Sequence, residues 1–276
     1  MTEYLSTGGG TIAYEVAGDG PLVVLAHGMG DSRASYRFVI PQLVAAGYRV
    51  AAADLRGCGE SSTDWPSFSR TDVADDLIAL IRHLGGPAVL VGQSFSGGSA
   101  TIAAAQHPDL VSGIVELAPF TRAQSIKLGD FRVKRYRAGT TRLLGTAILG
   151  SVKLWLSYLD VAFPGRKPAD WADQTDRIRS MMGEPARMKA MQKMGMSKPT
   201  DAGDHLARVQ CPALIVEGSL DPDWADPRAE GEAIVAALPN AELAVIEGAG
   251  HYPHTQYPDE TVALLLPFLA RTAARA

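Results

Sequence analysis

Short apolar runs alternate with helical patterns along this chain. The runs cover residues 22–26, 50–53, 88–91, 113–118, 213–216 and 243–246. Nearly continuous apolar runs of this length are typical of strands that are buried on both faces of a sheet. Helical patterns lie between them, near residues 33–46, 72–84, 97–107, 228–238 and 259–272. The alternation predicts an α/β fold, with a mostly parallel sheet of about eight strands flanked by helices.

Two stretches depart from this rhythm. Residues 11–17 alternate in polarity after a GGG turn, which predicts one arm of an N-terminal hairpin. Residues 121–203 lie between two predicted strands and show no strand pattern of their own. They are too long for a plain connection. We therefore expect a helical cap (lid) at 121–203, inserted into a core of residues 1–120 and 204–276.

The predicted cap also differs from the core in composition. It holds 16 Lys or Arg and 7 Asp or Glu, a net charge of +9, whereas the rest of the chain has a net charge of −13. Six of the eight methionines fall between Met181 and Met196. Met188, Met191 and Met194 recur at three-residue spacing, which predicts one soft apolar face of a helix.

The overall composition narrows the class of protein. Of 276 residues, 46% are apolar and 20% charged, which is ordinary for a soluble globular protein, and the net charge of −4 disfavours nucleic-acid binding. The N-terminus lacks the basic and apolar regions of a signal peptide, and no run reaches the ~18 apolar residues of a membrane span. These features favour a cytoplasmic protein without stable membrane insertion. Cys58 and Cys211 are expected to be free thiols, with a single disulfide as the alternative.

The strongest chemical signal is the sequence GQSFSGG at residues 92–98. It follows the strand 88–91 directly and leads into a helix, so Ser94 is pushed out of the sheet with its hydroxyl exposed as a nucleophile. Such a turn needs small residues two places on either side. Gly92 satisfies this, whereas Ser96 stands where the common G-x-S-x-G pattern has glycine. A serine that only caps the strand-helix junction is the alternative.

Two further segments carry a family resemblance. HGMG (residues 27–30) follows the strand 22–26, and DLRGCGES (54–61) follows the next strand. Together with GQSFSGG, these segments resemble the α/β-hydrolase superfamily, whose members often read D-x-R-G-x-G-x-S after that strand. The resemblance covers nearly the whole chain, with the cap least determined, and it implies a serine-nucleophile hydrolase.

The resemblance also implies an oxyanion hole. It places one amide donor at Met29, in the HGMG loop, and the second at Phe95, just after the nucleophile. His27, Gly28 and Gln93 lie beside these positions and are predicted to contact the substrate. For His27 we favour a role in holding the loop over one in which it ionises.

The general base of this fold comes last in chain order, after the final strand. Glu-Gly-Ala-Gly-His at residues 247–251 fits that place, and G-x-G-H looks like the histidine loop of the family. The glycines let the loop turn so that His251 can reach Ser94. His254 is the competitor, without the glycine-rich approach.

The acid of the triad is expected after the strand 213–216. The family usually has it three residues after a glycine such as Gly218, and Asp221 matches that position. Asp223 and Asp226 are close by and are the alternatives, although the two Asp-Pro pairs of this loop also suit turns. Glu116 is a remote alternative on the preceding strand.

These residues predict acyl transfer through a Ser94–His251–Asp221 triad, with no metal or organic cofactor. A carboxylic ester or lactone is the first choice of substrate. Thioesterase, C–C bond hydrolase and cofactor-free haloperoxidase-like activity share the same triad. A serine nucleophile argues against haloalkane dehalogenases and epoxide hydrolases. A receptor-like ligand-binding protein with a retained triad is the alternative of another class, because some family members of that kind carry a G-x-S-x-S turn.

The cap suggests what the substrate looks like. Its aromatic and methionine side chains predict a small apolar substrate, although packing of the cap onto the core explains most of them. Seven Lys or Arg fall within residues 122–142 beside one acid, Asp130. They predict either attraction of a substrate with an anionic end, or a solvated face, an acidic partner or a membrane-surface patch. Both a monomer and a homodimer fit the sequence.

Overall fold

The computed structural model describes residues 1–123, 127–197 and 200–273. Eight strands form one sheet in the order β1-β2-β4-β3-β5-β6-β7-β8, and every pair from β4 to β8 is parallel. The strands are β1 Glu3–Thr7, β2 Gly10–Ala17, β3 Leu22–Ala26, β4 Arg49–Ala53, β5 Ala88–Gln93, β6 Val111–Leu117, β7 Ala213–Gly218 and β8 Ala241–Ile246. This arrangement confirms the predicted α/β fold, including the antiparallel hairpin of β1 and β2.

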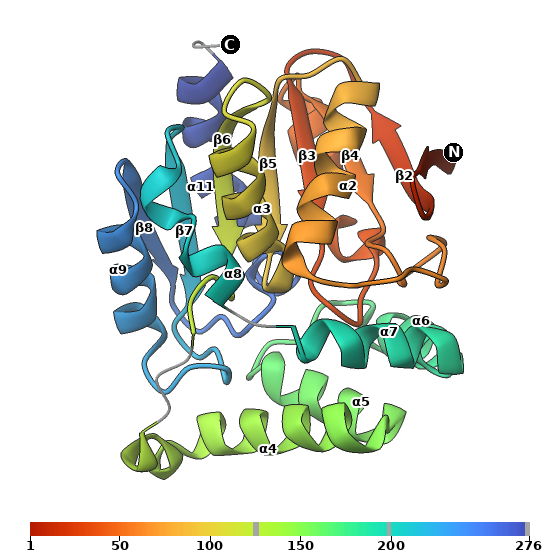
Figure 1. Cartoon of the computed structure of the whole chain (residues 1–276). Helices are drawn as coiled ribbons and strands as arrows, with labels where there is room; N and C mark the ends of the chain where they lie inside the picture. Colours follow the sequence, from red (N-terminus) through yellow and green to blue (C-terminus); the bar gives the residue numbers. More distant parts are fainter. Residues whose placement is uncertain (124–126, 198–199, 274–276) are drawn as a thin grey trace.

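Helices cover both faces of the sheet (Figure 1). The helices of the sheet layers are α1 Ile40–Ala45, α2 Arg70–His83, α3 Phe95–Gln106, α9 Pro227–Ala237 and α11 Pro258–Ala273, with the short α8 Thr200–Gly203 and α10 Pro253–Gln256. Residues of α2, α3 and α9 share one buried apolar cluster with the sheet, whereas α1 and α11 share another. The central strand β3 is buried at every position, as its continuous apolar run predicts.

The predicted helix at 33–46 is wrong in one respect, because the segment forms two pieces. A 3-10 helix spans Arg33–Tyr36, and α1 begins only at Ile40. Pro41 lies in the first turn of α1, where its missing N–H would have no helical partner. The proline therefore suits the start of a helix and would break the middle of a longer one.

The segment between β6 and β7 contains helices that lie across one end of the sheet (Figure 1). We call α4 Lys134–Leu149, α5 Val152–Ala162, α6 Trp171–Met182 and α7 Pro185–Gly195 the cap helices. They lie at the end where the parallel strands finish, which is where α/β sheets bind their ligands. Met188, Met191 and Met194 are all buried on α7, which confirms the predicted apolar face.

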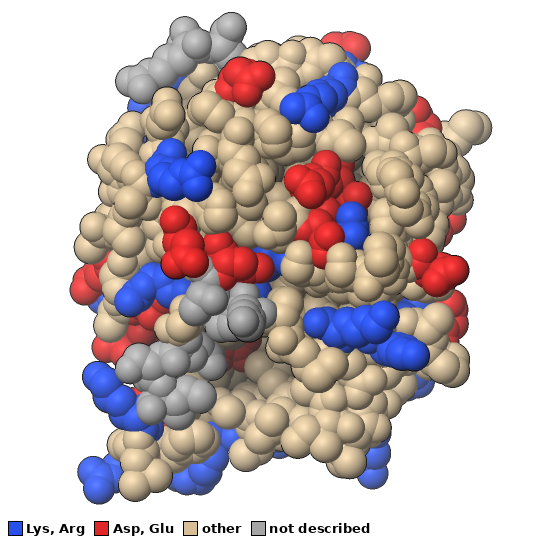
Figure 2. Space-filling view, viewed as in Figure 1, with Lys and Arg blue, Asp and Glu red and all other residues tan. Residues whose placement is uncertain are grey.

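Charge is distributed unevenly on the surface. Figure 2 shows Lys and Arg side chains at the end of the molecule that carries α4, whereas Asp and Glu gather over the sheet layers of the same face. Both cysteines are free, as predicted. Within the described residues, we find no helix that combines the length and the apolar character of a membrane span.

Candidate active site

Ser94 sits in a strained turn between β5 and α3. Its φ of +53° is rare for a residue with a side chain. The turn is held by backbone hydrogen bonds, in which the Ser94 N–H donates to the Leu117 carbonyl (2.9 Å) and the Ser94 carbonyl accepts from the Phe120 N–H (3.1 Å). A Cβ added at Gly92 would lie 2.2 Å from the Ser96 carbonyl oxygen, so this position requires glycine. The backbone therefore fixes the direction of the Ser94 side chain.

Ser96, which departs from the common pattern, has a defined partner. Its hydroxyl donates a hydrogen bond of 2.5 Å to the carbonyl of His27, and both residues are fully buried. This bond ties the Ser94 turn to the loop that follows β3. A glycine at position 96 would leave the His27 carbonyl without this donor.

The residues around this junction hold the loops together. The Leu55 N–H donates to Nε2 of His27 (3.0 Å), so Nδ1 carries the proton and donates to the Gly28 carbonyl (2.6 Å). Burial lowers the pKa of His27, which keeps the ring neutral. Gln93 is also buried and donates to the His251 carbonyl (2.9 Å). In this arrangement His27 and Gln93 position other groups, and their polar atoms face the protein.

The predicted amide donors lie in the same region. The N–H of Phe95 is the first of α3 and has no partner within the helix. Neither this amide nor that of Met29 donates a hydrogen bond to any residue that the structure describes. Gly28 lies between the two segments, since a Cβ there would be 2.2 Å from Oε1 of Gln93 and 3.0 Å from Cβ of Ser94. The two loops thus approach each other closely, with two unoccupied donors nearby.

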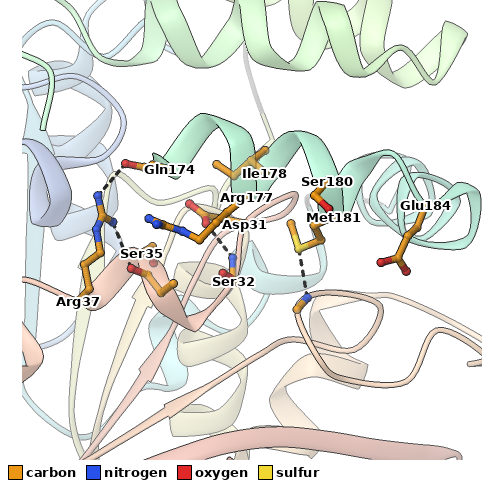
Figure 3. Close-up of a pocket in the computed structure, with 12 residues that line it drawn as sticks. Asp31, Ser32, Ser35, Arg37, Gln174, Arg177, Ile178, Ser180, Met181 and Glu184 are labelled. Carbon is orange, nitrogen blue, oxygen red and sulfur yellow. Dashed lines mark hydrogen bonds between the residues drawn. The ribbon is translucent and has the colours of Figure 1, made fainter. Parts of the chain in front are cut away.

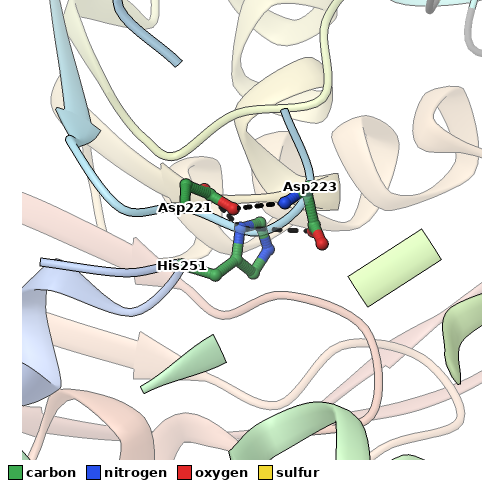
Figure 4. Close-up of side chains that lie close together, drawn as sticks. All are labelled: Asp221, Asp223 and His251. Atoms are coloured by element: carbon green, nitrogen blue, oxygen red, sulfur yellow. Dashed lines mark hydrogen bonds and ion pairs between the residues drawn. The ribbon is translucent and has the colours of Figure 1, made fainter. Parts of the chain in front are cut away.

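His251 lies between two carboxylates (Figure 4). Its Nδ1 is 2.8 Å from Oδ2 of Asp221 and 3.3 Å from Oδ2 of Asp223. The Asp223 N–H donates to Oδ1 of Asp221 (2.8 Å), and the hydroxyl of Tyr158, from α5, donates to Oδ2 of Asp223 (2.8 Å). Asp221 makes the shorter contact, whereas Asp223 shares its oxygen with Tyr158. No hydrogen bond joins Ser94 to His251 among the described residues, and catalytic contacts of this kind often tighten only with substrate.

Burial and charge set the protonation of this group. Burial alone would lower the pKa of His251, but the charges of Asp221 and Asp223 outweigh it and raise this pKa to about 9. Burial, helped by the charge of Asp221, raises the pKa of Asp223 to about 7. The three groups are in contact, so they titrate as one system.

The same three side chains could in principle hold a metal ion. Their ligand atoms all lie within 4.8 Å of one another. The Nδ1–Oδ2 distance of 2.8 Å between His251 and Asp221 is, however, that of a direct hydrogen bond. We therefore interpret the cluster as a hydrogen-bonded group, with a proton between His251 and Asp221, and not as a metal site.

The alternatives predicted from the sequence lie elsewhere. His254 is fully buried and stacks on the Tyr36 ring at 4.6 Å. Asp226 is exposed and caps α9 by accepting from the Ala229 N–H (3.1 Å). Glu116 is buried on β6 and accepts a hydrogen bond from Thr101. Each of these three residues therefore has a partner of its own, and none needs a role beside Ser94 to explain its position.

Ser94 opens onto a cavity of about 450 Å³ between the core and the cap helices. Ser94, Phe95, Met29 and Asp223 are among its lining residues. Other lining residues come from the cap helices and neighbouring loops, and most of them are apolar: Phe120, Phe131, Leu143, Leu144, Ala147, Trp155, Met191 and Met194. A cavity of this size, largely apolar with a few polar groups, suits a small organic ligand.

A second cavity, of about 310 Å³, lies between the loop 31–37 and α6 (Figure 3). Arg37 bridges the two elements, with bonds to Asp170 (Nε–Oδ2 2.6 Å) and Gln174 (Nη2–Oε1 2.9 Å). The predicted nucleophile, base and acid do not line this space. We therefore place the substrate site in the cavity at Ser94.

The basic cluster of residues 122–142 does not line that cavity in the described part of the chain. Arg122 pairs with Glu230 at 3.3 Å, and Arg135 donates to the carbonyls of Asp221 (3.3 Å) and Ala225 (2.9 Å). Arg135 thereby links α4 to the loop that carries Asp221. Others, such as Lys134, are exposed on α4.

Sequence reasoning missed two polar side chains at the site. Tyr158 was counted among the cap aromatics, and no pattern marked its contact with Asp223. Arg70 lines the cavity from the first position of α2. A signal for Arg70 was present, because a basic residue in the first turn of a helix opposes the helix dipole.

Comparison with known proteins agrees with this fold. Residues 23–264 match the model of a family described as the alpha/beta hydrolase family. The chain is 27% identical to a 2-(acetamidomethylene)succinate hydrolase of Mesorhizobium japonicum, over 94% of this chain and 91% of the relative. It is 29% identical to a pimeloyl-[acyl-carrier protein] methyl ester esterase of Edwardsiella ictaluri, over 89% of this chain and 92% of that one.

A solved structure shows the same arrangement along the full length. The thermophilic esterase from Thermogutta terrifontis superposes with a TM-score of 0.77 at 25% identity, and the match covers 99% of both chains.

Proposed function

Because this chain belongs to the alpha/beta hydrolase family and is a hydrolase, we propose that it cleaves a carboxylic ester or lactone through an acyl-enzyme on Ser94. The observation that carries the proposal is the strained Ser94 turn at the end of a cavity whose polar wall also includes Asp223, beside the His251–Asp221 pair. A relative that is named as a methyl ester esterase supports the bond type.

In the proposed mechanism, Ser94 Oγ attacks the substrate carbonyl while Nε2 of His251 takes its proton. Asp221 accepts from Nδ1, which keeps that proton in place and stabilises the imidazolium. The amides of Met29 and Phe95 bind the developing oxyanion. His251 then protonates the leaving group, and a water molecule repeats the sequence on the acyl-enzyme.

We also propose that residues 121–203 act as a lid. The support is that α5 contacts the proposed base and its neighbour directly. The backbone N–H of His251 donates to the Ala162 carbonyl (2.9 Å), and the Tyr158 hydroxyl donates to Asp223. Trp155 on the same helix donates from Nε1 to the Gly30 carbonyl (3.2 Å). The apolar cavity wall favours a small, largely apolar acyl or alkyl group.

The test is covalent labelling together with a substrate panel. A serine-directed phosphonate should add one adduct mass, and Ser94→Ala should abolish both the adduct and turnover, with kcat lower by about 10⁴–10⁶. Labelling at another serine would contradict the assignment. A panel of p-nitrophenyl esters from acetyl to octanoyl, lactones and thioesters then separates the possible activities. Single-turnover behaviour on all of them would favour a receptor-like protein instead.

A further inference from the structure

Arg70 is a buried cation on the wall of the Ser94 cavity. Its side chain is only 6% exposed, yet the residue lines the cavity together with Ser94 and Phe95. It belongs to the core helix α2 and not to the basic segment of the cap. Among the described lining residues it is the only Lys or Arg.

The hydrogen bonds of Arg70 leave part of its guanidinium unused. Nε donates to the Phe120 carbonyl (3.1 Å), and Nη1 donates to the Ser197 hydroxyl (3.2 Å). The Asp201 carboxylate is 3.7 Å from Nη1, a distance that makes an ion pair with Arg70 but is longer than a hydrogen bond. Nη2 donates to no residue within the described ranges. A guanidinium has five N–H donors, so three of the five have no acceptor among the described residues.

A purely structural role explains only some of these contacts. The bonds to Phe120 and Ser197 fasten α2 to two loops, and that accounts for Nε and Nη1. It does not explain why Nη2 has no acceptor among the described residues. It also does not explain why a cation lies where both burial and the helix dipole disfavour it. Burial penalises the charge and lowers the pKa of Arg70, which the charge of Asp201 offsets only in part, and the positive end of the α2 dipole repels it. An anion in the cavity would offset both penalties.

We propose that Arg70 binds the carboxylate of the substrate, so that the ester cleaved at Ser94 carries a carboxylate a short chain away from its carbonyl. This inference rests on the proposed function. The guanidinium lies 4.5 Å from the centre of the Phe95 ring, and Phe95 directly follows Ser94 in the chain, so the anion site lies in the same cavity as the nucleophile and close to the residue after it. A single cation in an apolar wall suits a monoanion, and the planar fork matches a carboxylate.

The test compares substrates that differ only in charge. Monomethyl esters of the four- to seven-carbon dicarboxylic acids are set against the corresponding dimethyl esters, and kcat/KM is measured for each. The wild-type enzyme should prefer one or more of the monoacids by about 10- to 100-fold, the range of a charge-assisted hydrogen bond. Arg70→Met should abolish this preference, and Arg70→Lys should keep part of it. Lys134→Met, which removes an exposed cap cation, is the matched control and should leave the preference unchanged.

The preference ratio separates recognition from structural damage. A variant that merely loosens Phe95 lowers kcat/KM for both esters, and their ratio stays constant. A wild-type enzyme without preference for any monoacid, or an Arg70→Met variant that keeps it, would overturn the inference. Inhibition needs no variant: pentanoate should inhibit neutral-ester hydrolysis by the wild-type enzyme more strongly than pentanamide, and equal inhibition would also overturn it. Failure of Ser94 to react with any neutral ester or phosphonate would instead overturn the proposed function.

Discussion

Two carboxylates lie beside His251, and we predict that one of them, Asp223, shifts the pH dependence of the activity. Replacing Asp223 by Asn removes a negative charge 3.3 Å from Nδ1 and keeps an oxygen that can accept from Tyr158. At an effective dielectric constant of 20, one full charge at this distance contributes about 5 kcal/mol, or roughly 3–4 pKa units. Burial raises the pKa of Asp223 to about 7, so the carboxylate is ionised near pH 9, where His251 titrates. The pKa of His251 should therefore fall in Asp223→Asn, by up to about 3 units.

The sign of the effect on activity follows from the role of the base. His251 must be neutral to accept a proton, so activity is lost as the pH falls through its pKa. In the wild-type protein this pKa is raised to about 9, which places the acid limb of kcat/KM above that of an ordinary histidine. Asp223→Asn should move the limb to lower pH with little loss in the plateau. Asp221→Asn should instead lower kcat by about 10⁴, because the imidazole loses the partner that fixes its tautomer.

The assay is the pH profile of kcat/KM for a neutral ester from pH 5 to 10, followed by pH-stat titration of the released acid. Asp226→Asn is the matched control, since it removes an exposed charge from the same loop and keeps a side chain that can cap α9. A limb that is the same in the wild type, Asp223→Asn and Asp226→Asn would refute the electrostatic reasoning. If Asp223→Asn abolished turnover and Asp221→Asn only moved the limb, Asp223 would be the acid of the triad.

Two other changes test how the loops around Ser94 are held. Gly28→Ala should lower kcat by about 10- to 1000-fold through displacement of an oxyanion donor, because its Cβ would collide with Gln93. Thermal unfolding would show whether the fold survives, and an unchanged kcat would place the donor elsewhere. Ser96→Ala removes the buried bond to the His27 carbonyl and should cost about 1–3 kcal/mol of unfolding free energy. Urea denaturation measures this, and a change under about 0.5 kcal/mol would mean that the carbonyl finds another donor.

Local patterns were sufficient to predict the elements of the sheet. Continuous apolar runs identify strands that are buried on both faces of a sheet. β3 has the predicted bounds because every residue of its run is apolar and buried. The turn at Ser94 was recognisable since its requirement for glycine at position 92 is a backbone constraint within five residues. The helix predicted at 33–46 was divided by Pro41, whose effect on a helix start is also local.

What the sequence determined by itself was therefore the order of strands and helices, the strained turn at Ser94 and the two glycine-rich loops, because each depends on residues that are close in the chain. Only the tertiary structure decided which carboxylate lies nearer His251, since Asp221 and Asp223 are two residues apart and both reach the ring. It also decided that Ser96 binds His27, that Tyr158 reaches Asp223, and that the cation facing the cavity is Arg70 of the core instead of an arginine of the cap. These contacts join residues between 28 and 69 positions apart. Their geometry depends on how the helices and loops pack around the sheet, and no short pattern in the chain encodes that packing.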